Sequence, residues 1–183
     1  MDIQFNNLRQ EKDAIGVVFC DNKCRLIGYG KKLDQLSKKY ISNIIKSDIS
    51  FQERNSKNFD YSIIHQPANL KLSKLYVFKL KNFKDYQIRD FQVLGGHLNS
   101  LIKFYKETNV IVYPDGISSS KVGSLNAISE MILGMSLASY SFTKYFSKKD
   151  DKKKQSKTKK KKIKIYSSQH TRLSKNYDCL LYT

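Results

Sequence analysis

Residues 75–113 read LYVFKLKNFKDYQIRDFQVLGGHLNSLIKFYKETNVIVY. The first six of these residues and VIVY at 110–113 are short apolar runs, which predict buried strands. Between them, apolar residues recur at the spacing of one helix face. These residues are Ile88, Phe91, Leu94, Leu98, Leu101 and Tyr105. A strand, a helix and a strand in this order form a βαβ unit, so we expect parallel strands joined by a right-handed crossover.

Two strands and a helix are predicted upstream of this unit. The run AIGVVFC at 14–20 predicts a buried strand that ends at the turn signal DNK. FDYSIIHQ at 59–66 predicts another strand, stopped by Pro67. Between these strands, residues 31–46 predict one amphipathic helix. Its apolar positions are Leu33, Leu36, Tyr40, Ile41, Ile44 and Ile45.

A long amphipathic helix is predicted from Ser124 to Phe146, because apolar residues again recur three and four positions apart. The chain then divides into three parts. Residues 1–147 form an α/β domain, residues 148–164 a Lys-rich linker or tail, and residues 165–183 a short terminal segment. IKIYSS at 163–168 could begin a strand, but the residues after it have no clear period, so we expect the terminal segment to be disordered.

The chain carries a net charge of +18, and half of this excess lies in one segment. Residues 148–164 hold eleven lysines and two aspartates. So dense a run of like charge repels itself and buries no apolar surface. Two interpretations stay open, a solvated linker and a tail that binds polyanions through lysine–phosphate contacts. The candidate nucleic-acid residues are Lys152, Lys153, Lys154, Lys157, Lys159, Lys160, Lys161 and Lys162.

Two observations weaken the nucleic-acid interpretation. Only five of the 34 cations are arginines, the residue that base readout and bidentate phosphate contacts favour. The segment contains no aromatic residue on which a base could stack. Abundant Lys, Asn, Ile and Tyr also follow from drift in an AT-rich genome.

Several classes of protein are excluded by the sequence pattern. No stretch approaches eighteen consecutive apolar residues, so we expect no membrane span. The start, MDIQFNNLRQEKDA, has no apolar core of a secretory signal, and three cysteines do not make a disulfide scaffold. We therefore expect a cytoplasmic protein.

No catalytic, cofactor-binding or metal-binding constellation is found by motif. The sequence holds three histidines and no HExxH pattern. Cys20 and Cys24 supply two thiols, which do not close a zinc site, and Cys179 has no neighbour that would activate it. Gly95-Gly96 lies inside a helical period, where close helix packing or a kink explains it better than a phosphate cradle. Gly28 and Gly30 precede a helix and offer a weak anion nest.

The end of the predicted long helix resembles a known family. In LASYSFTKY at 137–145, with Glu130 and Gly134 before it, the order of residues is similar to the helix that closes the N-terminal domain of cytosol (leucyl) aminopeptidases. The order of the upstream elements is similar as well. The chain departs from the family pattern at Glu130, which is not adjacent to the glycine, at Phe146, where the family often has Lys, and at 79–81, where a glycine pair is missing.

The resemblance implies a macro-domain-like fold, with a mixed, mostly parallel sheet flanked by helices. In the family, this domain supports hexamer assembly and is joined to a catalytic domain that binds two divalent cations, zinc or manganese, and releases N-terminal residues from peptides. The family's NTDAEGR metal-ligand stretch does not occur in these 183 residues, so no catalytic residue is carried over.

Our first hypothesis is therefore a truncated, non-catalytic N-terminal domain of a leucyl aminopeptidase, inactive alone. Its partners would be a catalytic domain or further copies of the chain. We expect no association with a membrane. The alternative is a stand-alone basic module that binds nucleic acid through the Lys-rich segment. A third hypothesis, a macro domain that binds ADP-ribose, lacks a convincing glycine-rich phosphate loop.

Overall fold

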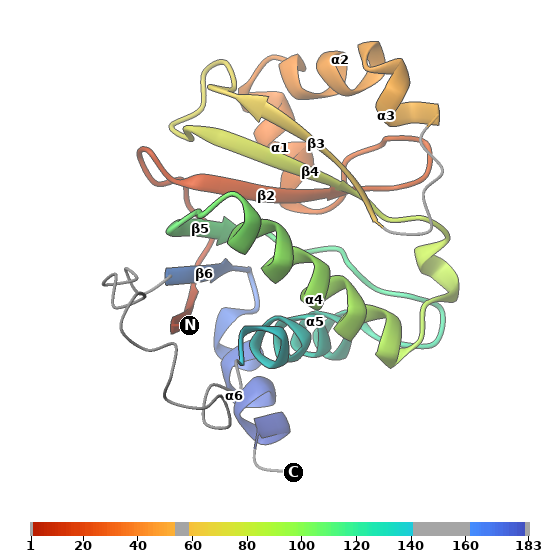
Figure 1. Cartoon of the computed structure of the whole chain (residues 1–183), viewed down its shortest axis with the longest axis vertical. Coiled ribbons are helices and arrows are strands. Elements are labelled where there is room, and N and C mark those ends of the chain that lie inside the picture. Colours follow the sequence, from red (N-terminus) through yellow and green to blue (C-terminus); the bar gives the residue numbers. More distant parts are fainter. Residues whose placement is uncertain (1, 54–58, 141–161, 182–183) are drawn as a thin grey trace, which may run out of the picture.

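The computed structural model describes residues 2–53, 59–140 and 162–181. The described residues form one six-stranded sheet with the order β1-β6-β5-β2-β4-β3 (Figure 1). The strands are β1 (Asp2–Asn6), β2 (Ile15–Cys20), β3 (Asp60–His65), β4 (Lys74–Lys79), β5 (Asn109–Val112) and β6 (Lys162–Tyr166). All neighbouring pairs are parallel except β3 and β4, which are antiparallel. The predicted mixed, mostly parallel sheet is therefore confirmed.

Helices cover both faces of the sheet. The helices are α1 (Tyr29–Leu36), α2 (Tyr40–Ser47), α3 (Ile49–Glu53), α4 (Ile88–Phe104), α5 (Ser124–Ser139) and α6 (His170–Leu181), with a 3₁₀ turn η1 (Phe83–Asp85). The first three pack on one face, and the last three α-helices pack on the other (Figure 1). Successive β2 residues therefore enter opposite cores, Val17 on the α4 side and Val18 on the α1 side. This explains why β2 is an unbroken apolar run.

The predicted βαβ unit is β4–α4–β5. Its two strands are parallel but are not neighbours, because β2 lies between them: Val17 stands opposite Tyr76 of β4 on one side and Val112 of β5 on the other. Among the described residues, no helix has the length and apolar character needed to cross a membrane.

The helix predicted over 31–46 is wrong in one respect, since the structure divides it into α1 and α2. Lys38 and Lys39 have φ angles of 53° and 62°, and the Tyr40 amide donates a 3.1 Å hydrogen bond to the Ser37 carbonyl. This is a tight turn with two left-handed residues. Apolar spacing alone could not show it, because Leu33, Ile41 and Ile45 remain buried on the same side of the sheet.

The long helix is shorter than expected. It ends at Ser139, because Tyr140 has extended backbone angles of φ −72° and ψ 123°. The rest of the predicted helix, up to Phe146, lies outside the described residues.

The C-terminal end of the chain has the strand that IKIYSS could begin, and differs from expectation after it. Where a short terminal segment was expected from residue 165, the structure has the end of β6 and the helix α6. Strand β6 lies between β1 and β5, and the side chains of Ile163 and Ile165 are fully buried. The segment is thus part of the sheet, although the boundaries of the three parts remain a prediction.

Candidate functional site

The carboxyl ends of parallel strands are where open α/β sheets bind ligands, so this edge is the first place to look for a site. Here the loop that follows β5 folds back over the start of α1. A Cβ atom built on Gly28, which has a φ of 52°, would lie 1.6 Å from the carbonyl oxygen of Asp115. Main chain therefore fills the space into which a Cβ of residue 28 would project.

The Asp115 side chain ties the same loop to the loop between β6 and α6. Its Oδ1 accepts a hydrogen bond from the Ser167 hydroxyl, and its Oδ2 accepts bonds from the Ser168 amide at 3.0 Å and the Ser168 hydroxyl at 2.8 Å. Ser167 is completely buried. The carboxyl edge is thus a set of loops bonded to one another.

A small hollow of about 210 Å³ remains at the carboxyl ends of β2 and β4. Its polar groups bond to one another: the Asn22 amide donates to Asn82 at 2.8 Å, and Arg25 pairs with Asp21 at 2.7 Å. Burial raises the pKa of Asp21, but hydrogen bonds from Arg25 and Lys23 outweigh it, and the pKa lies below its usual value. These contacts stabilise the turn that follows β2. The described residues of this hollow include no nucleophile paired with a base.

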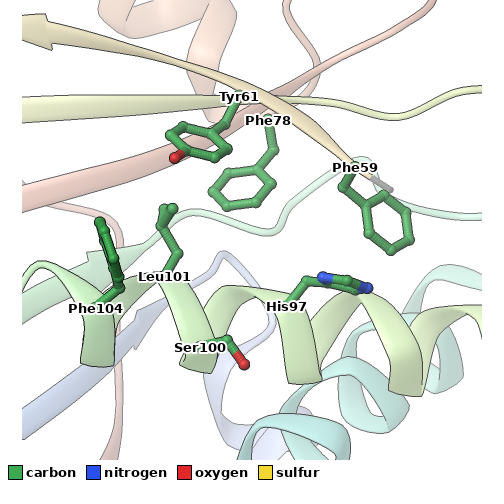
Figure 2. A pocket seen from close by; sticks show the side chains of 7 residues that line it. All are labelled: Phe59, Tyr61, Phe78, His97, Ser100, Leu101 and Phe104. Carbon is green, nitrogen blue, oxygen red and sulfur yellow. The ribbon is translucent and has the colours of Figure 1, made fainter. Parts of the chain in front are cut away.

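A second pocket, of about 400 Å³, lies between the β3–β4 pair and α4 (Figure 2). We call it the aromatic pocket. It is lined by Phe59, Tyr61, Phe78, His97, Ser100, Leu101 and Phe104. The first three come from the sheet side and the other four from α4. The Phe104 side chain is 76% exposed, while Phe78 is buried. Most of the surface that lines the aromatic pocket is apolar.

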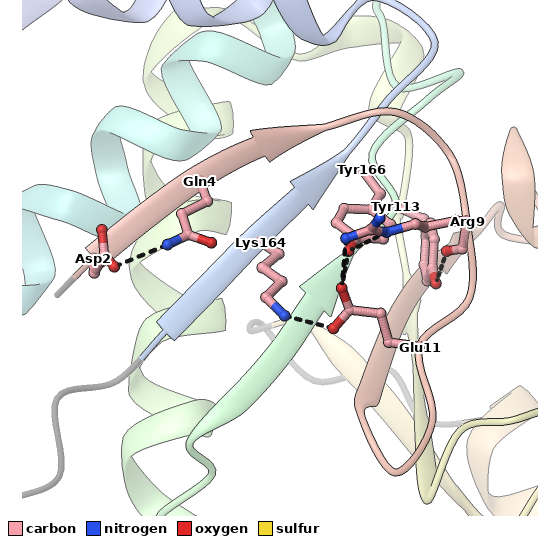
Figure 3. A network of polar contacts seen from close by, with 7 residues as sticks. All are labelled: Asp2, Gln4, Arg9, Glu11, Tyr113, Lys164 and Tyr166. Atoms are coloured by element: carbon pink, nitrogen blue, oxygen red, sulfur yellow. Dashed lines mark hydrogen bonds and ion pairs between the residues drawn. The ribbon is translucent and has the colours of Figure 1, made fainter.

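A polar network joins the segment between β1 and β2 to β6 (Figure 3). The Glu11 carboxylate accepts hydrogen bonds from Lys164 at 2.5 Å and from the Tyr166 hydroxyl, and Arg9 bonds both Glu11 and Tyr166. Burial raises the pKa of Glu11, but the bonds from Lys164 and Tyr166 outweigh it, so the pKa lies below its usual value. The network holds residues 9–11 over the sheet, which is a structural role.

Only one of the predicted nucleic-acid lysines lies within the described residues. Lys152, Lys153, Lys154, Lys157, Lys159, Lys160 and Lys161 lie outside the described residues. Lys162 is the first residue of β6, where it stands between Asp2 and Asn109 with an exposed side chain. Its amide donates to the Thr108 carbonyl at 3.0 Å, so its main chain serves the sheet.

The other singled-out residues occupy structural positions. Cys20 and Cys24 are buried in the core on the α1 side, and burial raises the pKa of both thiols. Gly95 packs against α5, which confirms the interpretation as close helix packing. In the parts of the chain that the structure describes, no group of three or more His, Cys, Asp or Glu side chains could hold a metal ion.

Comparison with protein families adds a direct match. The sequence profile of the "Cytosol aminopeptidase family, N-terminal domain" matches residues 17–149, a range that begins at the third residue of β2 and includes α5. The chain belongs to this family. A search of curated proteins finds no match.

Solved structures similar to this aminopeptidase N-terminal domain are macrodomains. A mutant macrodomain of Oceanobacillus iheyensis has a TM-score of 0.66 at 8% identity, covering 98% of this chain and 92% of that chain. The macrodomain of Mycobacterium tuberculosis DarG has a TM-score of 0.56 at 10% identity, covering 91% of this chain and 98% of that chain. Another Oceanobacillus iheyensis mutant, solved with ADPR, has a TM-score of 0.60 at 9% identity, covering 98% of this chain and 92% of that chain. At these identities the similarity shows the fold, and the predicted macro-domain-like architecture is confirmed.

The aromatic pocket of this domain was not predicted from the sequence. The sequence did contain one indication of the pocket. Phe104 falls beside the predicted apolar stripe that passes through Leu101 and Tyr105. An aromatic residue off the buried stripe of a helix is available to a surface site. The other walls come from β3 and β4, whose antiparallel pairing was not predicted.

Proposed function

We propose that this chain is a non-catalytic domain of a cytosol aminopeptidase, which supports assembly with a catalytic domain or with further copies of itself. The observation that carries this proposal is the family match over residues 17–149, on a fold in which those residues build most of the sheet. A cytoplasmic location follows from the same family assignment.

The chemistry of the whole aminopeptidase would be the metal-dependent release of N-terminal amino acids from peptides. The catalytic domain would hold two divalent cations, zinc or manganese. The described residues of this chain do not fit such a site, since they offer no cluster of three metal-ligating side chains. We therefore assign no catalytic step to them.

Activity of the purified chain tests this proposal. With leucine-p-nitroanilide and manganese, we expect no hydrolysis above a blank that contains metal and substrate alone. Hydrolysis that follows the protein through gel filtration and stops on chelation would contradict it. A second arm measures assembly: we expect sedimentation to show binding to a catalytic domain of the family or self-association, and a strictly monomeric chain that binds no such domain would count against the proposal.

Nucleic-acid binding is the second proposal, supported by the net charge of +9 in residues 148–164. Affinity for a labelled oligonucleotide should fall steeply with salt, because neutralised phosphates release counterions. Replacing the seven lysines from Lys152 to Lys161 with glutamine should abolish binding, while arginine at the same positions should preserve it. Equal binding by the glutamine variant would refute the assignment to these lysines.

One of the similar macrodomain structures was solved with ADPR, but we do not propose that this chain binds ADPR. That structure is 9% identical to this chain, so its similarity shows the fold alone.

A further inference from the structure

The aromatic pocket has the size of a small-molecule site. Its volume of about 400 Å³ falls within the range of roughly 300–1,000 Å³ in which proteins bind compact ligands. Of the seven described residues that line it, four are Phe or Tyr and none is Lys, Arg, Asp or Glu. A lining without formal charge is complementary to a neutral ligand, because it offers no counter-ion for a charge that would have to leave water.

The rings of the aromatic pocket already pack as aromatic pairs do. The Tyr61 and Phe78 centroids are 5.9 Å apart, and the Phe59 ring meets the His97 ring edge-to-face at 5.2 Å. Both distances lie in the range of about 4.5–7 Å that aromatic pairs prefer. Opposite these rings, Phe104 projects from α4 with most of its surface in water (Figure 2). A flat ring between Phe104 and the sheet side would extend the same packing and would cover Phe104.

Two polar side chains in the lining have hydrogen-bonding capacity to spare. The Ser100 hydroxyl donates to the Gly96 carbonyl at 3.0 Å, so its oxygen remains able to accept a bond. The His97 ring makes a ring contact with Phe59 and no hydrogen bond to any residue that the structure describes. A neutral imidazole has one accepting nitrogen. Both side chains can therefore accept a hydrogen bond from a ligand N–H or O–H.

We propose that the aromatic pocket binds a free, neutral, planar aromatic compound that carries one hydrogen-bond donor, such as an indole. Its ring packs against Phe104 and Tyr61, and its N–H donates to His97 or Ser100. The binding is independent of the aminopeptidase assignment, because it uses no metal and no residue of a catalytic domain.

The chain contains no Trp, so indole fluorescence excited where tyrosine does not absorb reports only on the ligand. We titrate the full chain into indole and expect a saturable blue shift of the emission. Phe104→Ala should weaken the affinity by about tenfold or more. Because the Phe104 ring is exposed, the Phe104→Ala variant should fold like the parent. Circular dichroism checks this. The matched control is Tyr140→Ala, since Tyr140 is 72% exposed but lies outside the lining. The Tyr140→Ala variant should bind indole with the same affinity as the parent protein.

Ligand analogues test the chemistry of the site. N-methylindole, which lacks the donor, should bind several-fold more weakly, and His97→Phe should reduce that difference. Indole-3-acetate should bind more weakly than indole, because the described lining residues include no Lys or Arg to pair with its carboxylate. The proposal is overturned if indole shows no saturable binding, if Phe104→Ala and Tyr140→Ala behave alike, or if the tripeptide Gly-Trp-Gly binds more tightly than indole, which would make the pocket a site for protein side chains.

Discussion

Gly95 of α4 lies directly against the main chain of Met131 in α5. A Cβ atom built on Gly95 would be 1.9 Å from the Met131 carbonyl oxygen, and one built on Gly134 would be 2.0 Å from the Gln92 carbonyl oxygen. The two helices therefore touch through their backbones, with a glycine from each at the crossing. This contact sets the position of α4, and α4 carries four residues of the aromatic pocket.

Replacing Gly95 with alanine should destabilise the domain. In a helix interior, Gly→Ala normally stabilises by up to about 1 kcal/mol. Here the added methyl group meets main chain, which cannot rotate away, and we expect a loss of about 1–3 kcal/mol in the free energy of unfolding. Urea denaturation measures this change. Gly96→Ala is the matched control, because its Cβ would lie 3.9 Å from the Ala138 Cβ, an ordinary contact. Equal stability of the two variants would show that the helices do not cross at Gly95.

Replacing Asp115 with alanine should loosen the carboxyl edge of the sheet. The substitution removes the acceptor of the buried Ser167 hydroxyl and two bonds to Ser168, and an unsatisfied buried group costs about 1–3 kcal/mol. Hydrogen exchange should accelerate at the amides of Ser168 and Gln169. Asp85→Ala is the control, since the Asp85 carboxylate is exposed and bonds to no described residue. If the two variants exchange alike, Asp115 does not hold the loops together.

The Glu11 network should make stability depend on pH. Because the pKa of Glu11 is lowered in the fold, its ionised form stabilises the folded state above the pKa of an unfolded glutamate, about 4.3. That contribution is lost as the pH falls through the lower folded value. Glu11→Gln should be less stable than the parent at pH 7, and the difference should shrink as the solution is acidified toward pH 3, as urea denaturation at each pH would show. A gap that stays constant over this range would contradict the network.

The three thiols should differ in reactivity. Cys20 is completely buried, and burial raises the pKa of its thiol and that of Cys24, so neither offers an accessible thiolate. Cys179 lies on the exposed side of α6. An aromatic disulfide reagent should label one thiol rapidly in the folded protein and all three after denaturation. Cys179→Ser should remove the rapid phase; rapid labelling of that variant would show that the core opens at Cys20 or Cys24.

Most elements of the fold could be predicted from local pattern. The apolar runs at Ile15–Cys20 and Asn109–Val112 and the stripe on Ile88–Phe104 depend on residues close together in the chain, so their spacing alone predicts them. β1 was not predicted: its sequence, DIQFN, is polar at alternate positions, and only Ile3 and Phe5 face the core. The Lys38–Lys39 turn was missed because lysine carries no turn signal.

The sequence by itself determined the α/β class, the βαβ unit and the family, because each depends on residue types at short, regular spacing. Tertiary structure alone decided that β6 enters the sheet between β1 and β5, that Asp115 closes the carboxyl edge over Gly28, and that Phe59 and Phe104 face one pocket. These features join residues tens of positions apart. They exist only once the free energy of burying both faces of the sheet has brought distant segments together.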